Sequence, residues 1–239
     1  MPKINHRAIH HHRSTGMPPS TPLLVTENLT KHYGKLQILN NINLQVHSGE
    51  VVAITGESGA GKSTLLHILA TLDTPDAGSL HLSGHNLLTL HGSNLAAFRN
   101  QHIGFVFQFH NLLPELTTLE NVCLPGYIGK RATKEVVKRA KELLQLLGLT
   151  DRLHHKPAAL SGGEQQRIAV ARSLINNPSI VFADEPSGSL DTHNAAIIHD
   201  LFIRLREQLG QTFVLATHDL DLANKSDRKL MIQDGVLSS

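Results

Sequence analysis

The stretch Gly56-Glu57-Ser58-Gly59-Ala60-Gly61-Lys62-Ser63 decides the fold, because it joins two segments with different periodicities. Residues 51–55, directly before it, form an uninterrupted apolar and β-branched run, which is typical of a strand buried on both faces. Residues 62–72, which begin within it, have a helical pattern. The order of strand, glycine-rich turn and helix predicts an α/β fold with a mainly parallel sheet.

The stretch itself fits the pattern G-x-x-x-x-G-K-[ST], which is typical of phosphate binding. Glycines let successive backbone N–H groups point toward phosphate oxygens, and the start of the helix adds the positive end of its dipole. We expect Lys62 to reach the β- and γ-phosphates and the Ser63 hydroxyl to coordinate Mg²⁺. The alternative is a glycine-rich turn that binds no ligand.

A second buried run, residues 180–183, ends in Asp184-Glu185. The carboxyl end of such a strand is where α/β sheets place ligand chemistry. We expect Asp184 to belong to the Mg²⁺ shell and Glu185 to polarise a water that attacks the γ-phosphate. The alternative is that the two acids only open a turn before Pro186.

The remaining patterns describe one large domain, which we expect to span residues 23–239. Strand-like alternation occurs at 23–27 and 38–46, a further strand is expected at 79–82 and a third buried strand at 212–217, and a terminal hairpin is expected at 229–237. Helical spacing occurs at 134–147, 161–174 and 195–209. The helical middle third therefore indicates a helical subdomain inserted in the α/β core, at about residues 96–174.

Composition excludes several classes of protein. Residues 1–22 form a flexible, basic, His-rich head that contains Lys3, Arg7 and Arg13 but no acid, so the head has a charge of +3. The net charge of the chain is +2, so residues 23–239 together have a charge of −1. A near-neutral body argues against an extended nucleic-acid surface. Cys123 is the single cysteine, which excludes a disulfide framework. No apolar run exceeds four residues, whereas a membrane span needs about 20.

His10-His11-His12 could bind a metal, and Met17 could be an alternative start.

A third motif, Leu160-Ser161-Gly162-Gly163-Glu164-Gln165-Gln166-Arg167, opens the helix expected at 161–174. Ser161 and Glu164 have capping-box spacing, and the two glycines expose N–H groups suited to an anion. With LSGGEQQ in place, the chain resembles the ATP-binding cassette ATPases over nearly all of residues 23–239. The other matching elements are the two phosphate-site motifs, Gln108, Ser189-Leu190-Asp191, His218 and the aromatic Tyr33, and all occur in family order.

The resemblance implies a P-loop NTPase (RecA-like) core with an N-terminal antiparallel β subdomain and the inserted α-helical subdomain. It implies ATP and Mg²⁺ as cofactors, with Lys62, Gln108, Glu185 and His218 as catalytic residues. The implied ATP-binding residues are Tyr33, Gly56, Glu57, Ser58, Gly59, Ala60, Gly61, Lys62, Ser63 and Thr64. The implied metal ligands are Ser63, Gln108 and Asp184. Ser161, Gly162, Gly163 and Asp191 would act in trans, across a head-to-tail dimer. Taken singly, Tyr33, Gln108, Asp191 and His218 could instead be a turn tyrosine, a loop glutamine, a helix cap and a strand-end histidine.

The resemblance also implies partners. A single cassette without a membrane span implies two separate transmembrane permease subunits and a peripheral position at the cytoplasmic face of the inner membrane. Residues 99–114, Glu120-Asn121-Val122 and Leu72-Asp73-Thr74-Pro75 resemble the lipoprotein-releasing ATPases. The alternatives are a macrolide-export-type or FtsE-like cell-division complex, and then a soluble non-transport ATPase. A DNA-repair ATPase would need a long coiled coil between Lys62 and Ser161, for which the chain has too few residues.

Overall fold

The computed structural model describes residues 21–238, so nearly all of the predicted head, including His10-His11-His12 and Met17, lies outside the described residues. Its centre is a six-stranded sheet in the order β10-β9-β3-β8-β7-β6. The strands are β3 (Val51–Thr55), β6 (Ile103–Val106), β7 (Ile180–Asp184), β8 (Thr212–Ala216), β9 (Arg228–Gln233) and β10 (Val236–Ser238). Five run parallel and β10 is antiparallel to β9, which confirms the predicted α/β fold with a mainly parallel sheet.

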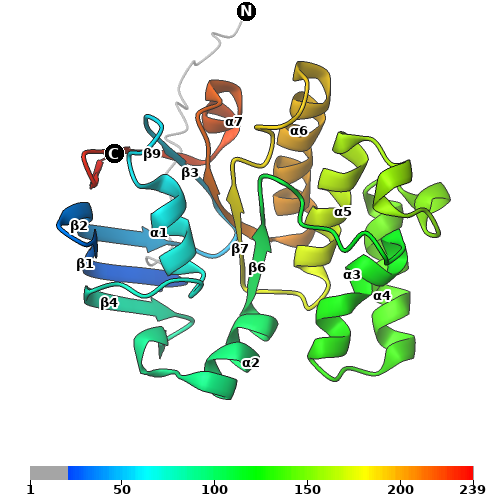
Figure 1. Ribbon diagram of the computed structural model, residues 1–239, viewed down its shortest axis with the longest axis horizontal. Helices are drawn as coiled ribbons and strands as arrows, with labels where there is room; N and C mark the ends of the chain where they lie inside the picture. Colours follow the sequence, from blue (N-terminus) through cyan, green and yellow to red (C-terminus); the bar gives the residue numbers. More distant parts are fainter. Residues whose placement is uncertain (1–20, 239) are drawn as a thin grey trace, which may run out of the picture.

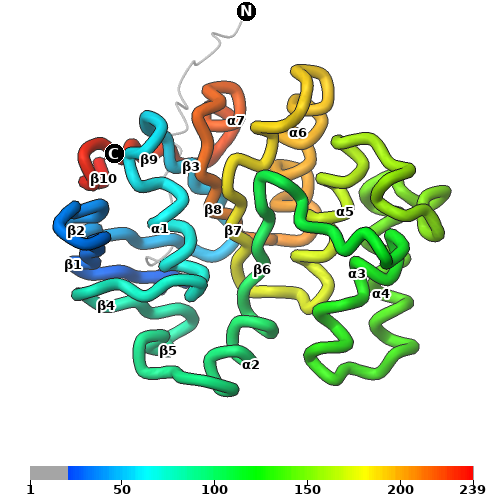
Figure 2. Tube along the Cα trace, viewed as in Figure 1, coloured from blue at the N-terminus to red at the C-terminus, as the bar shows by residue number. Residues whose placement is uncertain are grey.

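A second, antiparallel sheet has the order β2-β1-β4-β5. Its strands are β1 (Leu24–Tyr33), β2 (Leu36–Val46), β4 (Ala77–Leu82) and β5 (His85–Asn86). It is the N-terminal β subdomain, and Figure 1 shows it on the opposite side of the molecule from helices α3 and α4. Figure 2 shows β10 beside β2, and the two are joined where the Asn40 N–H donates to the Gly235 carbonyl at 2.8 Å.

Seven α-helices accompany the sheets within the described residues. They are α1 (Lys62–Leu69), α2 (Gly92–His102), α3 (Thr118–Ile128), α4 (Thr133–Leu146), α5 (Gly162–Leu174), α6 (Thr192–Leu209) and α7 (Leu220–Lys225). Short 3₁₀ turns lie at Leu87–Thr89, Thr150–Arg152 and Pro157–Ala159. Within residues 21–238 no helix combines the length and apolar character needed to cross a membrane.

Both faces of the large sheet are buried, in two separate cores. On β7, Ile180 and Phe182 pack with α1 and the small sheet, whereas Val181 and Ala183 pack with the helices α3 to α6. On β3, Val51 packs in the core with the helices α3 to α6, and Val52 packs in the core with α1 and the small sheet. This double burial explains why the parallel strands are continuous apolar runs in the sequence.

The structure places one part of the predicted insertion elsewhere. Residues 103–106 form β6, which pairs with β7 at the edge of the large sheet, although they fall inside the range 96–174. Helices α3, α4 and α5 share one core with each other, and α3 and α4 stand apart at the right of Figure 1. The helical insertion therefore follows β6 rather than containing it.

Candidate functional site

The turn between β3 and α1 is a curled loop whose backbone conformation favours glycine at three positions. Gly56, Gly59 and Gly61 have φ values of 154°, 81° and 104°. A side chain on Gly56 would collide with the carbonyl of Ile232, and one on Gly61 would come within 3.0 Å of Leu39. The loop is therefore held tightly against β9 and β2, and its shape requires the glycines that the motif supplies.

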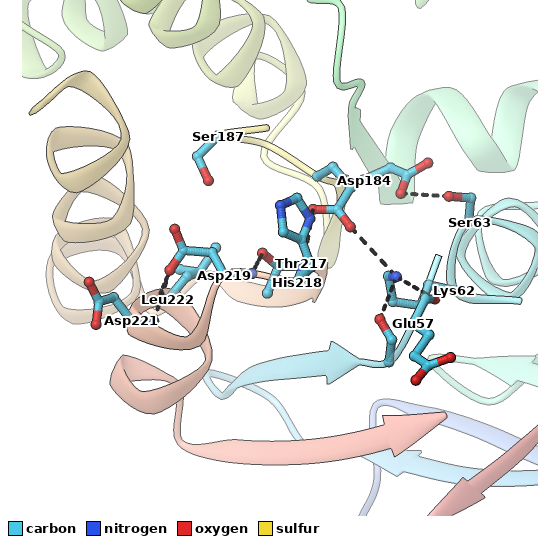
Figure 3. A network of polar contacts seen from close by, with 12 residues as sticks. Glu57, Lys62, Ser63, Asp184, Ser187, Thr217, His218, Asp219, Asp221 and Leu222 are labelled. Carbon is cyan, nitrogen blue, oxygen red and sulfur yellow. Dashed lines mark hydrogen bonds and ion pairs between the residues drawn. The ribbon is translucent and has the colours of Figure 1, made fainter. Parts of the chain in front are cut away.

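Lys62, the first residue of α1, turns back over this loop (Figure 3). Its Nζ donates to the carbonyls of Gly56 at 2.8 Å and Glu57 at 3.1 Å. The same atom lies 3.7 Å from Oε1 of Glu185, and only 8% of the side chain is exposed. The ammonium thus stands at the centre of the loop, where a phosphate oxygen would replace the neutral carbonyls as its partner.

Ser63 and Asp184 lie side by side, although they come from α1 and from the end of β7. The Ser63 hydroxyl donates to Oδ1 of Asp184 at 2.9 Å, and Nε2 of His67 lies 4.0 Å from Oδ2. Hydroxyl and carboxylate oxygens are the donors that Mg²⁺ prefers. Among the described residues, no cluster of three or more His, Cys, Asp or Glu side chains could hold a metal by itself. The pair therefore fits an ion that takes its remaining ligands from water and phosphate.

Glu185 and His218 meet at the ends of β7 and β8. Nδ1 of His218 lies 2.8 Å from Oε2 of Glu185, and the His218 backbone N–H donates to the same oxygen at 3.3 Å. Glu185 has a φ of 45°, and its own N–H donates to the Ala216 carbonyl. The Glu185 side chain is 14% exposed and that of His218 is 71% exposed. The carboxylate is therefore sheltered and oriented, while the imidazole remains accessible.

These groups open onto one cavity of about 650 Å³. It is lined by Ile38, Gly56, Glu57, Ser58, Gly59, Gly61, Lys62, Ser63, Thr64, Gln108, Glu185 and His218. Ile38, on β2, is a lining residue that the sequence motifs do not indicate. Ala60 faces an adjoining hollow of about 490 Å³ beside the β9–β10 turn. Asp184 is outside the lining but is held to it through Ser63.

Tyr33, at the end of β1, does not line this cavity. Its hydroxyl donates to Oδ2 of Asp73 at 2.8 Å, the residue is 53% exposed, and Nζ of Lys31 lies 5.1 Å from the ring centre. Burial raises the pKa of Asp73, but hydrogen bonds from Lys31 and Tyr33 outweigh it and leave that pKa below its ordinary value. Lys31 and Asp73 thus fix the aromatic ring, a role that the sequence does not indicate for either residue.

The residues expected to act in trans lie apart from the cavity. Ser161 caps α5 in a capping box with Glu164, and Asp191 caps α6. The Asn194 side chain donates to Asp191 at 2.6 Å and packs where a Cβ on Gly163 would lie. Within the described residues, none of Ser161, Gly162, Gly163 and Asp191 lines the 650 Å³ cavity. Figure 1 shows α1 and α5 on opposite sides of the β6–β7 pair.

A nucleotide-sized cavity lined by a phosphate loop at the carboxyl edge of a parallel sheet defines a P-loop nucleotide-binding protein. The family model described as ABC transporter matches residues 39–188, and the chain belongs to this family. The chain is 58% identical to the "Lipoprotein-releasing system ATP-binding protein LolD" of Cytophaga hutchinsonii, over 90% of this chain and 98% of that protein. The protein of the same name from Bacteroides thetaiotaomicron is 54% identical over 90% and 99% of the two chains.

Solved structures show the same architecture. A dimeric structure of the bacterial ABC transporter cassette MJ0796 has a TM-score of 0.82 and 41% identity, over 90% of this chain and 97% of that one. A dimeric post-hydrolysis state of the same cassette, bound to ADP and Pi, also has a TM-score of 0.82, with 40% identity. Both cover nearly all of the described residues and confirm the ABC ATPase fold.

Proposed function

We propose that this chain is the ATP-binding and ATP-hydrolysing motor subunit of an ABC transporter that releases lipoproteins from the inner membrane. The observation that carries the ATPase part is the convergence of the phosphate loop, Ser63, Gln108 and the Glu185–His218 pair on one cavity. The lipoprotein part rests on identities of 48% to 58% with proteins named for a lipoprotein-releasing system, each matched over nearly its whole length.

ATP binds with its phosphates in the glycine-rich loop and its base against Tyr33. The loop amides of residues 56–64 and the Lys62 ammonium neutralise the phosphates locally, so affinity needs no net positive field from the body. Ser63, Asp184 and Gln108 would hold Mg²⁺. When bound, the ion withdraws charge from the β- and γ-phosphates.

Hydrolysis depends on the ends of β7 and β8. Glu185 orients and deprotonates the attacking water, and its carboxylate is held in place by the N–H and the imidazole of His218. When ATP is bound, the Lys62 ammonium leaves the carbonyls of Gly56 and Glu57 and contacts the γ-phosphate. Its positive charge there stabilises the negative charge that develops during hydrolysis. Each of these groups acts from the same chain.

Two copies complete the site. Ser161, Gly162, Gly163 and Asp191 supply N–H and polar groups to the ATP of a partner copy, because they do not reach the cavity of their own chain. The dimeric cassettes among the structural relatives support this arrangement. Neither copy alone neutralises the triphosphate, so bound ATP holds the two copies together and its hydrolysis releases them.

The motor works on separate membrane subunits. Phe109 is 73% exposed and Leu113 is 42% exposed in the segment that follows Gln108, and this apolar surface is where a permease segment docks beside the nucleotide site. The partners are two LolC/LolE-like permease subunits, which place the chain at the cytoplasmic face of the inner membrane as a peripheral protein. Nucleic acid is not among the partners.

Two experiments test this function. The purified chain should hydrolyse ATP in the presence of Mg²⁺ and lose the activity when Mg²⁺ is chelated. Depletion in cells, followed by separation of the membranes, should leave outer-membrane lipoproteins in the inner membrane. Normal lipoprotein sorting after depletion would instead favour macrolide-type export or a cell-division role, and co-purification with a ribosome would exclude a transport function.

A further inference from the structure

His199 is a buried histidine on α6 that no motif of the nucleotide site includes. Only 2% of the residue is exposed. Its Nε2 lies 2.9 Å from the Ser187 hydroxyl and 3.6 Å from Oδ2 of Asp219. An imidazole in the core is expensive unless its nitrogens are hydrogen-bonded, and an aliphatic side chain would fill the same space. The polar contacts therefore need an explanation beyond packing.

The two partners of His199 are neighbours of the two residues at the ends of β7 and β8. Ser187 is two positions after Glu185, in a tight turn where the Gly188 N–H donates to the Glu185 carbonyl at 3.0 Å. Asp219 directly follows His218. Figure 3 shows Ser187 and Asp219 on the side of His218 away from Lys62. From α6, His199 thus contacts the same two loops that the Glu185–His218 contact joins at the cavity.

Asp219, the second polar neighbour of His199, is itself held in place. Its Oδ1 accepts from the N–H groups of Asp221 at 2.8 Å and Leu222 at 3.1 Å, which begins α7. Its N–H donates to the Thr217 hydroxyl at 3.0 Å. The remaining oxygen, Oδ2, is the one that faces His199. At 3.6 Å from Nε2 of His199, Oδ2 is beyond hydrogen-bond distance, so this contact is electrostatic, whereas the contact to Ser187 at 2.9 Å is a hydrogen bond.

The imidazole serves as a hydrogen-bonding group rather than as a charge. Burial lowers the pKa of His199, against the opposing influence of Asp219, so the ring is neutral near pH 7. A small cavity of about 240 Å³ beside this contact is lined by His199, His218, Ser187, Asp219 and Lys225 among others. It leaves room for the loops to shift when the link is absent.

We propose that His199 is a positioning residue that holds the Glu185 loop and the His218 loop in register through Ser187 and Asp219. The inference rests on the proposed ATPase function, because the register matters for orienting the attacking water. It assigns no contact with ATP to His199. Its removal should therefore reduce turnover while leaving nucleotide binding intact, since the groups that line the phosphate loop are unchanged.

The test compares two substitutions at one position. His199→Phe fills the space without a hydrogen bond, and we expect kcat to fall about tenfold or more with KM for ATP changed less than about twofold. His199→Gln places an amide nitrogen near the position of Nε2, and we expect it to recover most of the lost kcat. The matched control is Phe202→Leu, a buried substitution one turn away on α6 that removes packing against Phe213 and leaves both loops alone.

Several outcomes would overturn the proposal. They are wild-type kcat in His199→Phe, an equal loss of kcat in Phe202→Leu, or no recovery in His199→Gln. If His199→Phe does not fold, Ser187→Ala carries the same test from the other side of the link. Hydrogen exchange of nucleotide-free protein judges the link apart from turnover: residues 185–190 and 217–222 should both exchange faster in His199→Phe. If the wild-type chain fails to hydrolyse ATP, the proposed function fails, and this exchange result still decides the link.

Discussion

At the scale of single residues, the site consists of a few groups whose positions are set by backbone turns that few other residues could make. Three glycines of the phosphate loop and Glu185 all have positive φ. A non-glycine residue in this region is strained and persists where its surroundings determine it. Glu185 is held by its N–H bond to Ala216 and by both contacts from His218. The strain marks the point where the carboxylate must face the cavity.

Lys62→Ala tests the electrostatic role of the loop lysine. The substitution removes a charge-assisted contact to the phosphates, and we expect ATP affinity to fall about tenfold to a hundredfold by calorimetry. Lys229→Ala is the matched control, because Lys229 is an exposed lysine on β9 outside the cavity lining. Equal affinities in the two variants would show that the loop amides alone bind the phosphates.

At the scale of elements, the sequence predicts best what is periodic or chemically unusual. The strands β3, β7 and β8 and the helices α4 and α5 lie within a residue or two of their predicted ranges, because each has a continuous apolar run or a clear helical stripe. β6 was not predicted as a strand, since Gly104 interrupts an already short run. Helix α3 was also missed, because Pro125 lies inside it, although Thr117 and Glu120 form a capping box at its start.

The candidate site divides in the same way. The motif residues around the phosphate loop, Glu185 and His218 come together as the order of strands predicts, because parallel strands end at one edge of the sheet. Ile38, Asp73 and His199 could not be found from the sequence, because each reaches its position through tertiary pairing rather than through a local pattern. Asp73, for example, meets Tyr33 across 40 positions of the chain.

Helix α5 contains a buried amide side chain without a hydrogen-bond partner among the described residues. Gln166 is 0% exposed, and neither atom of its amide has a partner among the described residues. Leaving such a group unsatisfied is unfavourable, so Gln166→Met, with a similar length and no amide, should raise the free energy of unfolding by about 1 kcal/mol. Urea unfolding measures the change, and Gln165→Met is the control, because the Gln165 amide donates to the carbonyls of Pro157 and Leu160. A gain in Gln165→Met equal to that in Gln166→Met would contradict the explanation.

At the scale of the whole molecule, acid should weaken the fold in two stages. Burial lowers the pKa of His102, His110 and His199 below 6.5, so below about that pH the unfolded chain binds protons that the folded chain resists. Hydrogen bonds, first from the Ser161 backbone, lower the pKa of Glu164 below 4.5, so its contribution is present above that value and is lost as pH falls through its folded pKa. Urea midpoints measured from pH 7.5 to 3.5 should begin to fall below about 6.5 and fall further below 4.5. His102→Gln should shrink the first stage only, and an unchanged first stage would assign it to other groups.

The proposed division of the site between two copies leads to a prediction about assembly. Glu185→Gln keeps the shape and the hydrogen-bonding capacity of the side chain but removes the base, so turnover should fall about a hundredfold or more while ATP still binds. ATP that is bound but not cleaved continues to join the phosphate loop of one copy to Ser161 and Gly163 of the other, so the variant should elute as a dimer in ATP and Mg²⁺ and as a monomer in ADP. Adding Ser161→Phe places a bulky ring at the exposed start of α5, far from the variant's own cavity, and should abolish the dimer while leaving ATP affinity within about threefold. A dimer that persists in the double variant would mean that the two copies meet through a surface other than this one, and a strong loss of ATP affinity would mean that Ser161 serves the cavity of its own chain.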